Sequence, residues 1–267
     1  MATGKWFNPQ KCPICGHGKI GVWCTVSTNG NAVCCMRVES DTPIKNGGWL
    51  HRIGERVMEY RMPERQAPPP PDFTFRHAAW LDKTTPAEIE AHAESLGVSP
   101  SALEDLSAAY AWNHNAWAWP MRDGSGMIVG IRLRAEAGKK WAVLGSHQGV
   151  FVPASWPDMP REAVICEGPT DTAAALSIGL LGIGRPSCLG CEVALIETLK
   201  RMGVRRVVIV ADHDGPGLAG AKRLAGQLRM PWKIIMPPEK DMRAWLVAGV
   251  TRDLFECVVS QQVWTMP

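Results

Sequence analysis

The chain has 267 residues, of which 46% are hydrophobic and 21% are charged, and its formal net charge at pH 7 is +3. This composition can build sizeable cores and excludes a disordered chain, and no apolar run approaches the roughly 18 residues of a membrane span. Nine cysteines, an odd and partly clustered set, argue against a secreted disulfide scaffold and for metal binding in a reducing compartment. We therefore expect a cytoplasmic protein with no membrane partner.

Residues 1–62 are predicted to form a β-type zinc ribbon. The segment has five cysteines, one more than a tetrahedral zinc site needs. Asn29-Gly30 is typical of a tight hairpin turn, which would place Cys24 opposite Cys35 and turn Cys34 to the other face. The predicted zinc ligands are therefore Cys12, Cys15, Cys24 and Cys35. The alternatives are unrelated buried thiols or a disulfide between Cys24 and Cys35.

The same segment has the surplus of positive charge, with eight lysines and arginines against four aspartates and glutamates. Aromatic and basic side chains follow the last cysteine, a combination that suits stacking on bases while contacting phosphates. The candidate residues for binding single-stranded DNA are Arg37, Trp49, His51 and Arg52. The alternative is an ordinary solvated basic face with Trp49 as a packing residue.

The next two segments are a linker and a small mixed α+β subdomain. Residues 63–73 are rich in proline, which favours an extended linker. Within residues 74–160, Thr85-Pro86 and Ser99-Pro100 predict helix starts, and the helical pattern continues to Trp112. Residues 117–152 then alternate in short runs between turn signals, which predicts a small antiparallel sheet.

Residues 161–267 show the pattern of a parallel sheet. The short β-type runs AVIC, VVIVA and KIIM are each followed by a helical stretch, which is typical of βαβ units. The carboxyl ends of parallel strands meet at one edge of the sheet, where ligands bind. Acidic residues follow all three runs: Glu167, Asp212, Asp214 and Asp241. Such carboxylates repel one another without a cation, so we predict a Mg²⁺ or Mn²⁺ site for phosphoryl chemistry.

Other interpretations of this segment are weaker. GPGLAG at Gly215–Gly220 matches a dinucleotide-binding pattern, but Asp212 and Asp214 would repel a pyrophosphate there. No GxxxxGK[ST] motif of a P-loop ATPase occurs. Asp171 near the start of a helix is most simply a cap or a partner of the helix dipole.

The order of these motifs resembles a known family. EGPTD, then DHDG, then KD resemble the Toprim domain that primases, topoisomerases and some nucleases share. A four-cysteine ribbon joined to it by a linker is similar to phage primase-helicase proteins and bacterial replicative primases. The stretch PMRDGSGMIVGIRLRAEAGKKWAVLGSHQGVFVP also resembles the basic subdomain that precedes Toprim in phage-type primases. The implied fold is α/β, with a Toprim-type parallel sheet after the mixed subdomain and the zinc ribbon.

The resemblance also implies an activity and residue roles. The activity is synthesis of short RNA primers on single-stranded DNA from ribonucleoside triphosphates, with a separate helicase as a partner. Asp212 and Asp214 match metal ligands, and Glu167 matches a glutamate that binds metal or transfers a proton. Asp241 matches a third acidic position, although Ala244 stands near the place where the family often has a further acid or amide.

The resemblance assigns nucleotide or template binding to four basic residues of the mixed subdomain: Arg132, Arg134, Lys139 and Lys140. Arg132 and Arg134 alternate with Ile131 and Leu133, so the alternative is the solvated face of a strand.

Two other functions stay open. A Toprim nuclease would use water at the same metals, and a non-catalytic adaptor would bind single-stranded DNA and load a helicase. An adaptor has no need for clustered carboxylates. A topoisomerase requires a catalytic tyrosine, and the only tyrosines are Tyr60 and Tyr110.

Overall fold

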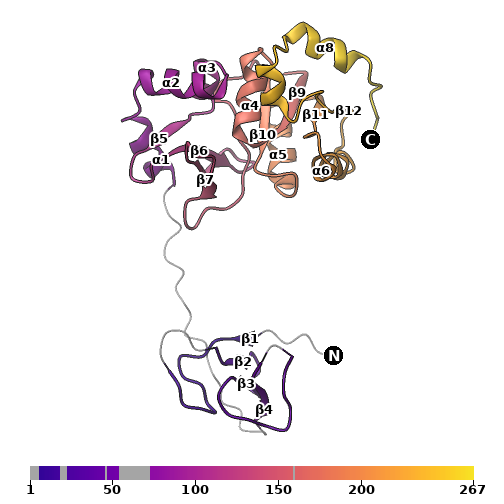
Figure 1. Cartoon of the computed structure of the whole chain (residues 1–267). Helices are drawn as coiled ribbons and strands as arrows, with labels where there is room; N and C mark the ends of the chain where they lie inside the picture. The colour runs from indigo at the N-terminus through magenta and orange to yellow at the C-terminus, as the bar shows by residue number, and fades with distance from the viewer. Residues whose placement is uncertain (1–5, 19–22, 46, 54–72, 159) are drawn as a thin grey trace. The chain divides into compact units, whose positions relative to one another are not determined.

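The computed structural model describes residues 6–18, 23–45, 47–53, 73–158 and 160–267, and the chain divides into two units, residues 1–68 and 69–267 (Figure 1). Apart from Phe73, the predicted linker at 63–73 lies outside the described residues. Within the described part of the chain, no helix combines the length and apolar character needed to cross a membrane.

The first unit is built on a four-stranded antiparallel sheet in the order β1-β2-β3-β4. Its strands are β1 (Trp6–Phe7), β2 (Thr25–Ser27), β3 (Ala32–Cys35) and β4 (Trp49–Arg52). Val26 pairs with Val33, the register predicted from the Asn29-Gly30 turn. Gly30 has a φ of 72°, a conformation that side-chain-bearing residues adopt with strain. The predicted hairpin is therefore confirmed.

The second unit begins with three helices and a four-stranded antiparallel sheet in the order β5-β6-β7-β8. The helices are α1 (Phe73–Leu81), α2 (Pro86–Leu96) and α3 (Pro100–Asp105). The strands are β5 (Ala109–Ala111), β6 (Ala116–Arg122), β7 (Ile128–Arg134) and β8 (Lys140–Ala142). Thr85 and Ser99 cap α2 and α3 as predicted, each accepting a hydrogen bond from a backbone amide of the first turn.

Three details of this part differ from the sequence-based expectation. Phe73, assigned to the linker, begins α1 and is buried in the core. Ala109–Ala111, assigned to the helical stretch, is strand β5, because its alanines face a tightly packed core against β6. The run at 149–153 adds no strand to this sheet, since Val150 and Phe151 make isolated bridges to Arg122 and Gly184 instead.

A parallel sheet in the order β10-β9-β11-β12 follows. Its strands are β9 (Glu162–Glu167), β10 (Gly182–Arg185), β11 (Arg206–Val210) and β12 (Trp232–Ile235). The helices are α4 (Gly168–Ser177), α5 (Glu192–Arg201), α6 (Gly215–Ala225), α7 (Met242–Val247) and α8 (Arg252–Ser260). The three predicted strands and their following helices are confirmed. The fourth strand, β10, was not predicted, because its sequence GIGR has two glycines and little β-type character.

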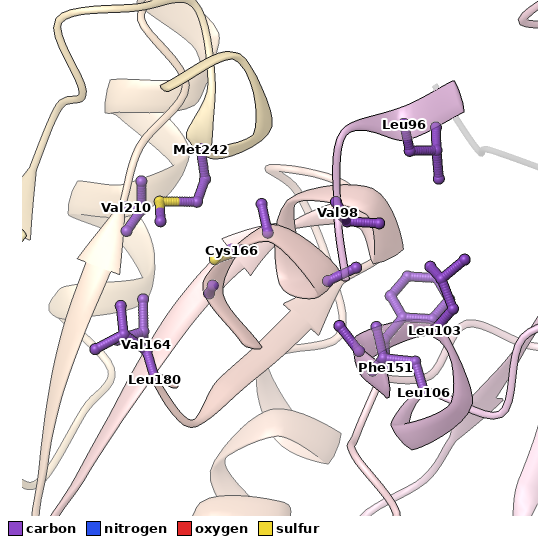
Figure 2. Close-up of a cluster of buried hydrophobic side chains, with 14 of the residues drawn as sticks. Leu96, Val98, Leu103, Leu106, Phe151, Val164, Cys166, Leu180, Val210 and Met242 are labelled. Carbon is purple, nitrogen blue, oxygen red and sulfur yellow. The ribbon is translucent and has the colours of Figure 1, made fainter. Parts of the chain in front are cut away.

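One hydrophobic core joins the helical part of the second unit to its parallel sheet. Figure 2 shows Leu103, Leu106 and Phe151 on one side of this core and Val164 and Val210 on the other. The core crosses the predicted boundary at residue 160. The two halves therefore support each other, and the edge of the parallel sheet that bears the acidic residues is held next to the antiparallel sheet.

Candidate metal centres and active site

Four thiols converge in the first unit. The Sγ atoms of Cys12, Cys15, Cys24 and Cys35 all lie within 4.8 Å of one another. Cys24 and Cys35 lie 3.9 Å apart across the hairpin, while Cys34, directly before Cys35, takes no part in the group. All four are free thiols, so no disulfide joins Cys24 to Cys35. Four sulfur ligands at this spacing suit a tetrahedral zinc ion, and the donor set therefore fits the predicted metal.

The predicted DNA-binding residues of this unit have local roles in part. Arg37 lies 3.3 Å from the ring of His17, and His51 contacts the carbonyl of Val38 at 3.0 Å. Trp49 pairs with Cys35 in the sheet and is half-buried, whereas Arg52 is exposed. Sequence reasoning missed Trp23, whose side chain is 78% exposed directly before the ligand Cys24. An exposed tryptophan beside the metal ligands is a better stacking surface than the half-buried Trp49.

The parallel sheet places the predicted acids at one edge, as expected from the direction of its strands. Glu167 is the last residue of β9, and Asp212 follows β11 closely. Asp214 and Asp241 are the N-caps of α6 and α7, and each accepts a hydrogen bond of 2.7 Å from a backbone amide of its helix. One carboxylate oxygen of each of these two caps is therefore already committed to the backbone.

Asp212 lies at the electrostatic centre of the acidic group. Burial, followed by the charges of Glu167 and Asp171, raises its pKa to about 8. Oε1 of Glu167 is buried and has no hydrogen-bond partner within the described part of the chain. A buried carboxylate oxygen without a hydrogen-bond partner, next to a carboxyl group that resists ionisation, is an environment that a divalent cation would relieve. The residues thus fit a hard metal ion.

Asp171 also belongs to this group, although the sequence suggested only a cap or a helix-dipole partner for its own helix. Glu167, not Asp171, is the N-cap of α4. Asp171 is buried, and its Oδ1 accepts a 2.9 Å hydrogen bond from the backbone amide of Arg243 in α7. Burial and the charge of Asp241 raise the pKa of Asp171 to about 7. The cap interpretation is therefore wrong for α4, since the side chain accepts from the first turn of another helix. Asp171 does lie in the first turn of α4, where the predicted interaction with the helix dipole is possible.

The acidic residues share one edge of the sheet, but their ligand atoms do not lie mutually close as the four Sγ atoms do. Among the described residues, the four cysteines form the only group of three or more metal-ligating side chains whose ligand atoms lie mutually close. The three ion pairs of the described chain involve none of the acidic residues at this edge. Arg185, which pairs with Glu167 in the sheet register and is buried, is close enough for its charge to interact with that glutamate. Arginines therefore do not already neutralise the group by direct pairing.

Three of the four predicted basic residues lie on strands of the antiparallel sheet, and Lys139 lies directly before its strand β8. Arg132 and Arg134 point to one side of β7, and both contact the parallel-sheet half of the unit. Arg132 donates to the carbonyl of Pro186 and Arg134 to the hydroxyl of Thr170, each at 3.3 Å. Lys140 is exposed and near enough to Asp171 to favour its ionised form, whereas Lys139 lies over the ring of Trp141. Arg134 and Lys140 thus border the acidic group.

The chain matches no protein-family description and no curated protein sequence. Solved structures resemble it clearly. A structure of the DnaG catalytic core has a TM-score of 0.58 at 15% identity, covering 72% of this chain and 79% of that one. A DnaG primase catalytic domain bound to single-stranded DNA has a TM-score of 0.56 at 15% identity, covering 73% and 80%. The fold is that of a primase catalytic core.

The primase fold extends to the first unit as well. The Aquifex aeolicus primase, with its zinc-binding and RNA polymerase domains, has a TM-score of 0.55 at 13% identity and covers 99% of this chain and 81% of that one. At such low identity the likeness establishes the fold, and it confirms the expected α/β architecture with a zinc-type unit before it. The roles of individual residues depend on the geometry described above.

Proposed function

We propose that this chain is a DNA primase, a nucleotidyltransferase that makes short RNA primers on single-stranded DNA. The observation that carries the proposal is the acidic group at the carboxyl edge of the parallel sheet, in a fold whose solved relatives are primase cores. Glu167, Asp212 and Asp241 come from three segments far apart in the sequence and meet at that edge. A purely structural role explains neither the unpartnered oxygen of Glu167 nor the raised pKa of Asp212.

Two kinds of metal fit the proposal. A structural zinc would be held by Cys12, Cys15, Cys24 and Cys35, which would fix the hairpin of the first unit. Mg²⁺ or Mn²⁺ would be held by the acidic group, chiefly Glu167 and Asp212, with Asp214 and Asp241 offering the oxygens that their helix caps leave free. When bound, such an ion lowers the pKa of the attacking 3′-hydroxyl and neutralises the leaving pyrophosphate.

The chain's own residues have three tasks in this reaction. The carboxylates fix the position of the reacting phosphate relative to the primer end, which is the main source of rate enhancement in phosphoryl transfer. Arg134 and Lys140, which border the acids, offer positive charge to the nucleotide phosphates. Arg132 of β7 and Lys139, directly before β8, offer charge to the template backbone. The first unit, with Trp23, Arg37, Trp49, His51 and Arg52, contacts the template strand.

The proposed partners follow from this activity. They are a single-stranded DNA template, ribonucleoside triphosphates and a helicase supplied by another chain, in the cytoplasm of a bacterial cell or a phage-infected host. One related structure is a DnaG primase domain bound to single-stranded DNA, and this supports the choice of template.

The test is to incubate the full chain with single-stranded DNA, labelled ribonucleotides and Mg²⁺ or Mn²⁺, beside the Asp212→Asn variant. We expect metal-dependent oligoribonucleotides from the parent and a loss of about 100-fold or more in the variant, because the charge that holds the cation is removed. Circular dichroism of both proteins checks that the variant is folded.

The same reaction separates the alternatives. Shortened input DNA, without new RNA, would replace the primase by a Toprim nuclease. DNA binding with neither product in either metal would leave the adaptor function and overturn the proposal.

A further inference from the structure

A cavity of about 660 Å³ lies beside the acidic group in the second unit. Residues of α2, of the antiparallel sheet and of α7 line it, including His92, Tyr110, Trp117, Arg134 and Arg243. A volume of this size suits a nucleotide-sized ligand. The two arginines come from segments more than 100 residues apart in the sequence. Arg134 is one of the four basic residues expected to bind nucleotide or template, whereas no sequence motif pointed to Arg243.

The two guanidinium groups line the same cavity, and neither is engaged in a direct ion pair with an acid of the described chain. Burial and then the positive charge of Arg243 lower the pKa of Arg134, so the two charges act on each other. Arg134 donates to Thr170 Oγ1 at 3.3 Å, and Arg243 donates to the carbonyl of Leu96 at 3.4 Å. Neither forms an ion pair within the described chain. Since a guanidinium group has five N–H donors, most of these donors stay available to an anion.

The rest of the cavity wall is consistent with a nucleotide. His92 stacks on Trp117 with ring centroids 4.0 Å apart, and Tyr110 lies edge-on to Trp117 at 5.6 Å. Burial, followed by the charge of Arg134, lowers the pKa of His92 to about 4, so this imidazole is neutral near pH 7. The aromatic part of the wall is therefore uncharged. Two glutamates also border the cavity, of which Glu88 is bound to Thr85 and Glu136 is exposed.

The arginines connect this cavity to the acidic group directly. The backbone amide of Arg243 donates to Asp171, and Thr170, the partner of Arg134, precedes Asp171 in α4. Arg134 is also within electrostatic reach of both Asp171 and Asp241. An anion held between the two guanidinium groups would therefore lie next to the proposed cation.

We propose that Arg134 and Arg243 form a clamp for the polyphosphate tail of a nucleoside triphosphate, whose base lies against the aromatic wall of this cavity. This deepens and rests on the proposed primase function, because it specifies where the chain holds its triphosphate substrate. It adds Arg243, a residue on the helix that Asp241 caps, to the residues that contact substrate. The clamp takes phosphates and not the DNA backbone, because both guanidinium groups line one cavity together with aromatic side chains.

Isothermal titration calorimetry with the full chain tests the clamp. The probes are α,β-methylene-ATP, which cannot be incorporated, and inorganic triphosphate, both in Mg²⁺. We expect Arg243→Gln and Arg134→Gln each to weaken the binding of both probes by about tenfold or more, since each removes a charged hydrogen-bond donor. Arg243→Lys keeps the charge but loses the fork geometry and should fall between the parent and Arg243→Gln. The exposed Arg229, changed to Gln, is the matched control and should bind as the parent does.

Further measurements separate the clamp from a structural role. Arg243 also supports the end of α2 through Leu96, so thermal unfolding of each variant is measured. A variant that unfolds at the parent's temperature but binds both probes weakly supports the clamp. Unchanged binding of either probe by Arg243→Gln would overturn it, as would a parent that binds neither probe. Weaker binding of single-stranded DNA with unchanged probe binding would also overturn it and make Arg243 a template contact.

Primer synthesis, followed with single-stranded DNA and labelled ribonucleotides, is measured separately from the binding of the two probes. A parent that makes primers while Arg243→Gln binds the probes normally contradicts the clamp alone. A parent that makes no primers but binds both probes through the two arginines contradicts the primase and leaves the clamp standing.

Discussion

The four-cysteine group of the first unit and the acidic group of the second unit are both candidate metal centres, yet they are built differently. The thiols lie mutually close, within 4.8 Å of one another. The carboxylates share one sheet edge, but Asp214, Asp241 and Asp171 each bind a backbone amide. Thiols are neutral at pH 7 at their ordinary pKa and can pack together, whereas ionised carboxylates repel one another. The zinc-type centre is therefore recognised by four ligand atoms that lie close together. The acidic centre is recognised by carboxyl groups whose burial and mutual repulsion raise their pKa values.

The largest effect should follow from breaking the compact centre. Cys35→Ser removes a buried ligand of the four-cysteine group, and the hairpin has little other core to hold it. We expect the variant to lose its zinc and the fold of the first unit, because in small zinc domains metal binding supplies the folding free energy. Metal content after dialysis should fall from about one zinc per chain to nearly none.

Cys34→Ser is the matched control for that experiment. Cys34 is the adjacent residue in the same strand, pairs with Thr25 and lies outside the ligand group. It should retain zinc at the parent's level. Equal zinc loss in both variants would contradict the hairpin register and the choice of four ligands.

A chelator should distinguish the two centres within one protein. EDTA should unfold the first unit while the second unit keeps its helices, because the core of the second unit is large and contains no thiol ligand group. Limited proteolysis followed by mass spectrometry measures this, with cleavage confined to residues 1–68 as the expected result. Cleavage spread evenly over both units would show that the acidic centre also holds its unit together.

The sequence alone predicted most of the four-cysteine centre and about half of the contacts at the acidic centre. The C-x2-C pair and the Asn29-Gly30 turn determine which sulfurs can meet, and both are local signals. At the acidic centre, strand direction alone brought Glu167, Asp212 and Asp241 to one edge. The contact between Asp171 and Arg243 joins residues 72 positions apart, and no periodicity or spacing signals it. The same holds for Arg134 beside Thr170, which depends on how two sheets pack.

The strain at the acidic centre should appear as a pH dependence of stability without metal. The pKa of Asp212 is raised to about 8 in the folded chain, above the unfolded value of about 3.8. The stabilising contribution of the protonated carboxyl is thus complete below about pH 4 and is lost as pH rises through about 8. We expect the thermal midpoint of the second unit in EDTA to fall by a few degrees between pH 5 and pH 9.

Two controls accompany this measurement. Asp212→Asn should weaken the pH dependence, because the amide cannot ionise and Asp171, whose pKa is raised to about 7, still titrates in this range. Millimolar Mg²⁺ should restore stability to the parent at pH 9 but not to the variant. A parent whose midpoint rises over the same pH range would show that Asp212 is stabilised as an anion by groups of the chain itself.

The smallest effect should come from the turn that aligns the zinc ligands. Gly30 has a φ of 72° and donates its amide to the carbonyl of Ser27 at 2.8 Å, so an alanine there is strained. Gly30→Ala should lower the free energy of unfolding of the zinc-loaded first unit by roughly 1 kcal/mol. It should weaken zinc binding by a similar free energy, because the turn holds Cys24 opposite Cys35 only while it is formed. Competition for zinc with a chromophoric chelator measures the zinc affinity.

Gly138→Ala is the comparison, since Gly138 also has a positive φ of 87° but lies in a turn of the second unit. It should lower the stability of its own unit and leave zinc affinity unchanged. If Gly30→Ala also left zinc affinity unchanged, the four thiols would be held by the C-x2-C loop and β4 and not by the hairpin.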